Sequence, residues 1–163
     1  MKNLAIGFAS LRPHTLPEDV CDIREREYYV CMQQLVRVLP ESFDLLICEN
    51  TIDDPNEIKT QGLRDFLNET ELCATGSESN IGTSNKGLGE LLQLKTVLDQ
   101  TDIDKYENIS YVTTRGYLTC PYVFEKTEKL NKQALLSNPD FIWLNGKVID
   151  CLLYTSPSPR DSS

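Results

Sequence analysis

The stretch that decides the fold is "FDLLICENTIDDPNE", residues 43–57, in which an apolar run ends abruptly in an acidic, polar turn. The run is short and almost wholly apolar, as expected of a strand that is buried on both faces. Asp54 stands at an N-cap position and Pro55 at the first helical position, so a helix is predicted from there to Glu69. A buried strand, a polar turn and a helix form the repeating unit of α/β proteins.

The same succession of strand and helix recurs on both sides of this stretch. Upstream, "NLAIGFAS" (3–10) predicts a strand, and residues 22–39 predict a helix that starts at a capping box of Asp22 and Glu25 and ends at Pro40. Downstream, the predicted elements are a strand within 71–79, a helix from about Lys86 to Asp99, a strand within 108–118, a helix within 121–138, and a strand or an Asn-Gly hairpin at 141–149.

This alternation predicts an α/β fold, a Rossmann-like three-layer sandwich with a mostly parallel sheet of about five strands. The helix at 86–99 is among the most regular of the elements. Its apolar side is predicted from the leucines that recur at helical spacing, Leu88, Leu91, Leu92 and Leu98.

Composition limits the classes of protein to be considered. The 163 residues suffice for one domain, and the net charge of −9 argues against a nucleic-acid surface, which requires clustered Lys and Arg. No apolar run approaches the roughly 20 residues of a transmembrane helix, and the N-terminus lacks a secretory signal. The six cysteines form no CxxC pair and lie mostly within apolar runs, which is typical of buried thiols. A cytoplasmic protein is predicted.

The end of the chain differs from the rest. Residues 151–163 read "CLLYTSPSPRDSS", which changes abruptly from α/β patterning to Ser, Pro and Arg. The stretch resembles the translation of a sequencing-library adapter, and a disordered terminus is the alternative. Residues 1–150 are therefore expected to be one incomplete α/β domain, truncated near Asp150, and 151–163 to be a non-native or disordered tail.

Ligands of parallel α/β sheets bind at the carboxyl ends of the strands. Four predicted loops meet there: "SLRPHT" (10–15), "ENTIDD" (49–54), "SESNIGTSNKG" (77–87) and "TTRGYLT" (113–119). Their polar side chains are expected to line one crevice.

An early strand, an acidic turn, an Asn-x-Gly turn before a helix and a further apolar strand together resemble the N-terminal nucleotide-binding half of glycosyltransferases with the A-type fold. The turn "CENTIDD" matches the acidic turn of that superfamily, and Asn80-Ile81-Gly82 matches its Asn-x-Gly turn. The resemblance covers most of residues 3–120. It implies a nucleotide-sugar donor and an acceptor of unknown identity, such as a glycan, whose site lies beyond the fourth strand.

The candidate substrate-binding residues lie on these four loops, and no catalytic residue is assigned. They are Arg12, Glu49, Asn50, Asp53, Asn80, Gly82, Asn85, Lys86 and Arg115. Each also has a structural interpretation: the glycines permit a tight turn, Asp53 neighbours a helix cap, and Lys86 is a solvent-facing lysine.

The metal motif of the superfamily is missing from its expected place. An Asp-x-Asp sequence commonly follows the fourth strand and holds Mg²⁺ or Mn²⁺, but here Thr113-Thr114-Arg115 stands there. The pair Asp102-Ile103-Asp104 precedes the strand and is predicted to be a turn. Arg115 and Lys86 are candidates to stabilise the diphosphate in place of a metal.

Two other classes of protein compete with this hypothesis. A methyltransferase-type domain requires a glycine-rich turn after the first strand, and "FASLRPHT" has none. A non-catalytic binding or scaffold domain remains as the second alternative, and a P-loop is rejected because Leu88-Gly89 replaces Lys-Ser/Thr after Gly87.

Overall fold

The computed structural model describes residues 2–74, 86–116, 118–119, 121–128, 135–138, 141–144 and 147–150. The predicted tail at 151–163 lies outside them. The described strands are β1 (Lys2–Ala9), β2 (Phe43–Glu49), β3 (Glu71–Ala74), β4 (Tyr106–Thr113), β5 (Leu135–Asn138), β6 (Phe141–Leu144) and β7 (Lys147–Asp150). The α-helices are α1 (Glu18–Val38), α2 (Gln61–Glu69), α3 (Lys86–Gln100) and α4 (Tyr122–Thr127), and two 3₁₀ turns are η1 (Pro55–Glu57) and η3 (Ile103–Lys105).

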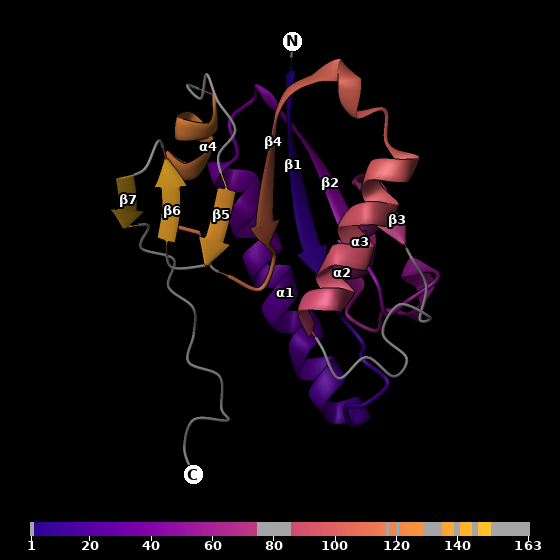
Figure 1. The fold of residues 1–163 in the computed structure, drawn as a ribbon. Coiled ribbons are helices and arrows are strands. Elements are labelled where there is room, and N and C mark those ends of the chain that lie inside the picture. Colours follow the sequence, from indigo (N-terminus) through magenta and orange to yellow (C-terminus); the bar gives the residue numbers. More distant parts are fainter. Residues whose placement is uncertain are drawn as a thin grey trace.

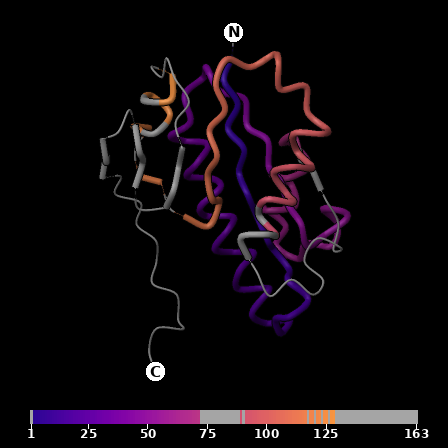
Figure 2. Tube along the Cα trace, viewed as in Figure 1, coloured from indigo at the N-terminus to yellow at the C-terminus, as the bar shows by residue number. Residues whose placement is uncertain are grey.

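The centre of the protein is a four-stranded sheet with the strand order β3-β2-β1-β4, and every pair in it is parallel. Figure 2 traces β1 and β4 running side by side through the middle of the molecule. The predicted α/β class and its parallel sheet are therefore confirmed.

Helices cover both faces of the sheet (Figure 1). Alternate side chains of the central strand β1 point to opposite faces, and each set packs against the helices on its own face. Leu4, Ile6 and Phe8 of β1 pack in one cluster with Val97 of α3. Ala9 packs on the other face, in a cluster built by α1 and α2. The result is the three-layer arrangement of helices, sheet and helices expected of a doubly wound protein.

Two of the predicted helix starts were wrong. Helix α1 begins at Glu18, after Pro17, and not at Asp22, so Asp22 and Glu25 are not a capping box. Both carboxylates instead bind the side chain of Arg12, in the loop after β1. Local sequence spacing does not reveal this long-range partner. The acidic first turn of Glu18 and Asp19 suits the positive end of the helix dipole.

The second wrong start concerns the segment after β2. Asp54 is an N-cap as predicted, and it forms a capping box with Glu57, but the structure it caps is only the 3₁₀ turn η1. The α-helix itself starts six residues after Pro55, at Gln61. Ile58, which lies between the two, is fully buried, so tertiary packing holds this segment out of the helix.

The apolar side of α3 was also wrongly predicted. Leu91, Leu92 and Leu98 are 64%, 39% and 38% exposed, whereas Gln93 and Val97 on the opposite side are buried. Gln93 donates from Nε2 to the carbonyl of Ala9 (3.1 Å), and this hydrogen bond lets a polar side chain face the sheet.

The last part of the chain departs from the predicted five-stranded sheet. Strands β6 and β7 pair antiparallel, as the hairpin alternative for 141–149 predicted. These strands and β5 make a separate three-stranded sheet, so the described parallel sheet has four strands. Helix α4 ends at Thr127, and Leu135–Asn138, predicted to be helical, is strand β5.

Candidate functional site

The carboxyl edge of the parallel sheet gathers the ends of its strands, and polar loops follow β1, β2 and β4. From β1 the chain passes through α1 to β2 on one side, and β4 joins the sheet on the other side of β1. The loop after β4 turns toward α1, as the loop after β1 does, because Arg115 binds Glu27 and Leu118 packs with Leu35. The order of the strands reverses between β1 and β4, and this reversal is a topological switch point. Such a switch point forms a crevice in which α/β proteins bind ligands.

Glu49, the last residue of β2, is fully buried and connects the loop after β1 to the loop after β2. Its carboxylate accepts hydrogen bonds from the backbone N–H groups of Leu11, Thr51 and Ile52, each at 2.7 Å, and from the hydroxyl of Thr51. Burial raises the pKa of the Glu49 carboxyl, and the four donors act in the opposite direction by favouring its charged form.

Two further hydrogen bonds fix the loop after β1 to the loop after β2. The hydroxyl of Ser10 donates to Oδ1 of Asn50 at 2.7 Å, and the backbone N–H of Arg12 donates to Oγ1 of Thr51 at 2.8 Å. The structure thus brings three of the candidate residues, Arg12, Glu49 and Asn50, to one edge of the sheet. The hydrogen bonds described for Glu49, for Asn50 and for the backbone of Arg12 connect the loop after β1 to the loop after β2.

The side chain of Arg12 turns away to α1, where it enters an ion cluster. Its Nη1 contacts the fully buried carboxylate of Glu25 and lies 3.0 Å from Oδ1 of Asp22. Oε2 of Glu25 accepts from the backbone N–H groups of Lys59 (3.1 Å) and Thr60 (2.8 Å).

The outer part of this cluster is more exposed to solvent. Nζ of Lys59 contacts the exposed Glu18 and lies 3.4 Å from Oδ2 of Asp22. The guanidinium of Arg12 is the largest influence that holds the pKa of the Asp22 carboxyl below its ordinary value. A surface hollow of about 350 Å³ lies beside the cluster and is lined by Asp22, Arg26, Lys59 and Thr60.

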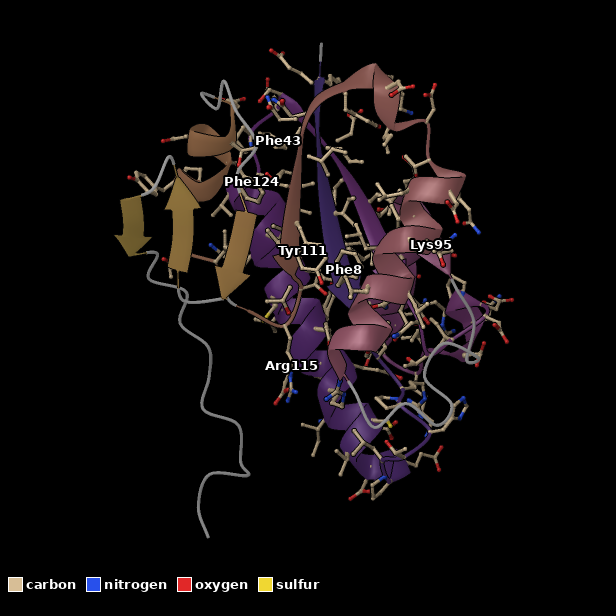
Figure 3. The ribbon with its side chains drawn as sticks, viewed as in Figure 1. Phe8, Phe43, Lys95, Tyr111, Arg115 and Phe124 are labelled. Carbon is tan, nitrogen blue, oxygen red and sulfur yellow. The ribbon has the colours of Figure 1, made fainter. Side chains whose placement is uncertain are left out.

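Arg115 lies in the loop that follows β4, as the sequence predicted, and this loop is at the switch point (Figure 3). Its side chain is 41% exposed, and its guanidinium binds Oε2 of Glu27 on α1, with Nη2 at 3.1 Å and Nε at 3.3 Å. The preceding residue, Thr114, donates from both its backbone N–H (3.1 Å) and its hydroxyl (2.6 Å) to the carbonyl of Phe8. The start of the loop is thereby held against the end of β1.

For the other candidate residues, the structure describes few contacts or none. Asp53 is exposed, and its backbone N–H donates to Oε1 of Glu57. Lys86 is the first residue of α3, and nothing further is described for its side chain. Asn80, Gly82 and Asn85 lie outside the described residues.

The amino end of α3 lies beyond the carboxyl edge of the sheet. Gln93 binds the carbonyl of Ala9 at the end of β1, and Lys86 lies seven residues before it. At 1.5 Å per residue the helix start is about 10 Å further along its axis. The N–H groups of a helix's first turn have no partner within the helix, so this helix end adds positive potential on the side where the loops emerge.

Arg24 is a residue of this edge that the sequence-based reasoning missed. Its Nη2 donates to the carbonyl of Ser10 at 2.7 Å, and its guanidinium carbon lies 5.6 Å from the ring centroid of Tyr28. The pattern that could have revealed it is the spacing on α1, where Arg24 shares a face with the buried Tyr28 and Cys31 at i+4 and i+7. A cation on a core-facing position requires a partner.

Metal ligation has no candidate within the described part of the chain, since no group of three or more His, Cys, Asp or Glu side chains is arranged to hold an ion there. Asp102 is the N-cap residue of η3, and Asp104 lies within that turn, before β4 and at the amino edge of the sheet. The prediction that this Asp-x-Asp is a turn is confirmed.

Comparisons with protein families, with curated proteins and with solved structures found no match to this chain. Among the described helices, none has both the length and the apolar character that crossing a bilayer demands.

Proposed function

We propose that this protein binds a nucleotide-activated sugar in the crevice at the carboxyl edge of its sheet, as the donor half of a glycosyltransferase-like domain. The observation that carries the proposal is the strand order β3-β2-β1-β4, which reverses between β1 and β4 and so creates a switch point there. The glycosyltransferase A-type assignment is part of the proposal, and so is the cytoplasmic location.

Two features of this edge support an anionic ligand, although the protein as a whole is acidic. Arg115 is at the switch point, and the amino end of α3 points to the same side of the sheet. Transfer of a sugar leaves a nucleoside diphosphate, whose developing charge must be stabilised by fixed cations or by a metal. In this proposal Arg115 and Lys86 contact the diphosphate, and the chemistry needs no Asp-x-Asp at the fourth strand.

The nucleoside is assigned to the loop after β2. Glu49 and Asn50 shape that loop, and Asp53 is exposed on it. The acceptor, for which a glycan is the leading candidate, and the group that activates it stay unassigned. Donor binding is therefore the part of the proposed function that has candidate residues.

A non-catalytic binding domain is the second candidate, and one observation favours it. The carboxylate of Glu49 already accepts four hydrogen bonds from the protein, and the side chain of Arg12 is engaged by Glu25 and Asp22. Groups that are saturated by their own chain act as scaffold rather than as ligand contacts.

Thermal unfolding in the presence of nucleotide sugars tests the proposal. Ligand at a hundredfold excess over its Kd stabilises the folded state by about 2.7 kcal/mol, and the Tm rises as a consequence. A panel of uridine, guanosine, cytidine and thymidine nucleotide sugars should contain a stabilising member. If no member shifts the Tm at millimolar concentration, the scaffold alternative gains and the donor-binding proposal fails.

A further inference from the structure

Arg24 is held at the switch point by contacts that use only part of its hydrogen-bonding capacity. A guanidinium has five N–H donors. One nitrogen, Nη2, donates to the carbonyl of Ser10 at the end of β1. In the described part of the chain Nε is buried without an acceptor, and Nη1 has none either.

An unsatisfied buried donor is uncommon in folded proteins, because it loses its hydrogen bonds to water without replacement. Where one occurs, an acceptor from a ligand or an ordered water is the usual explanation. Arg24 therefore has donors to offer at the very edge where the proposed function places an anionic ligand.

Arg115 contacts the stretch of α1 that carries Arg24, although the two residues come from different elements. Its partner Glu27 follows Arg24 by three residues on α1, and Sγ of Cys31, one turn further, lies 3.4 Å from the carbonyl oxygen of Arg115. Tyr28 lies on the same helix, between Glu27 and Cys31 in the sequence. Burial raises the pKa of the Tyr28 phenol, and the charges of both Arg24 and Arg115 oppose that rise.

We propose that Arg24 and Arg115 form a two-guanidinium site that binds the phosphate groups of the ligand at the switch point between β1 and β4. The proposal rests on the proposed function for the identity of the whole ligand, but the chemistry of the site is specific to phosphate. Guanidinium groups bind phosphate oxygens through two parallel N–H···O bonds, which a diphosphate offers repeatedly.

Glu27 competes with the ligand for Arg115. The Arg115–Glu27 pair is exposed on both sides, at 41% and 46%, and an exposed pair of this kind contributes little stability. A phosphate group can therefore displace the carboxylate at small cost. Removing the charge of Glu27 should strengthen binding, which is the opposite effect to removing either arginine.

Inorganic pyrophosphate is the probe for this site, because it carries the phosphate groups without the nucleoside or the sugar. Isothermal titration of the full chain with pyrophosphate would compare the wild type with R24Q, R115Q and R24K. R26Q is the matched control, since Arg26 is an exposed arginine on the same helix with no partner among the described residues.

R24Q and R115Q should each weaken pyrophosphate binding by about 10- to 100-fold, the loss of a charge-assisted hydrogen bond. R24K should retain more affinity than R24Q, and R26Q should match the wild type. The slope of log Kd against log salt should fall in R24Q and be kept in R24K, which a purely structural role of Arg24 would not produce. E27Q should tighten binding about two- to fivefold.

Two results would overturn the site: a wild type that does not bind pyrophosphate, or an R24Q variant that is folded and binds it as the wild type does. The proposed function fails separately. If pyrophosphate binds in an Arg24-dependent manner and no nucleotide sugar binds, the phosphate site stands and the donor assignment falls. If nucleotide sugars bind equally to the wild type and to R24Q, the donor assignment stands and this site falls.

Discussion

At the scale of single residues, the chain uses charged side chains from α1 to fix the loops at the edge of the sheet. Glu25 is the clearest case, because it is fully buried and yet binds Arg12 and two backbone N–H groups. The sequence shows that acidic residues are spaced along this helix. It does not show which of them meets a cation from a loop more than ten residues away, since that depends on how the loop folds back.

Replacing Arg12 with methionine tests the importance of this buried pair. R12M leaves the carboxylate of Glu25 buried without its counter-ion, which typically destabilises a protein by about 3–5 kcal/mol. Urea unfolding of R12M beside R26M would measure it, with the exposed Arg26 expected to cost less than about 0.5 kcal/mol. Equal stabilities of the two variants would contradict the structural role assigned to Arg12.

The pH dependence of stability offers a second test at this scale. Arg12 lowers the pKa of Asp22 in the folded state, so Asp22 contributes stability above its ordinary pKa of 3.8 and loses it as pH falls through the lower, folded value. D22N should be less stable than the wild type at neutral pH and should lose less stability between about pH 5 and pH 2. Parallel acid-unfolding curves for the two proteins would show that the pair is too well solvated to matter.

At the scale of elements, the sequence identified most strands and helices but misjudged which side of α3 faces the sheet. The strands β1, β2 and β4 were predicted because continuous apolar runs are characteristic of doubly buried strands. The side of α3 that faces the sheet was misjudged, because the leucine pattern marks the exposed side while Gln93 and Val97 face inward. Periodicity reports that a helix is amphipathic, and a hydrogen bond such as Gln93 to Ala9 can place a polar residue on its buried side.

Paired substitutions on α3 separate its two sides. V97A removes buried methyl groups from the cluster around Leu4 and Ile6 and should cost about 2 kcal/mol. L91K exchanges an exposed leucine for a charged residue and should change stability by less than about 0.5 kcal/mol. Thermal unfolding of both variants is the measurement, and a larger loss in L91K than in V97A would restore the orientation predicted from the sequence.

Gly7 tests how tightly β1 and β4 meet near the switch point. A Cβ at this position would lie 2.5 Å from Cγ2 of Thr114 and 2.9 Å from Cδ1 of Ile47. Thr114 cannot easily give way, because its hydroxyl is bonded to the carbonyl of Phe8. G7A should therefore destabilise the protein by about 1–3 kcal/mol, as overpacking does. A neutral G7A in chemical unfolding would indicate that β4 is packed less closely than described.

At the scale of the whole molecule, the order of the strands determines where a ligand is expected. The sequence predicted the α/β class and the edge that carries Glu49, Asn50 and Arg115, because parallel strands place their following loops together. It did not predict that Glu49 is saturated by the protein or that Arg24 reaches the same edge. Both depend on contacts between elements, which no local pattern encodes.

The central claim is that a phosphate-bearing nucleotide binds between the loops after β1 and β4, and a titration followed by two-dimensional amide NMR tests it most directly. On adding the nucleotide sugar that raises Tm the most, shift changes are predicted at Leu11, Arg24 and Arg115, at the carboxyl edge. Amides of η3 at the amino edge, Ile103–Lys105, should not move. Shifts confined to η3, or no shifts at saturating ligand, would contradict the account.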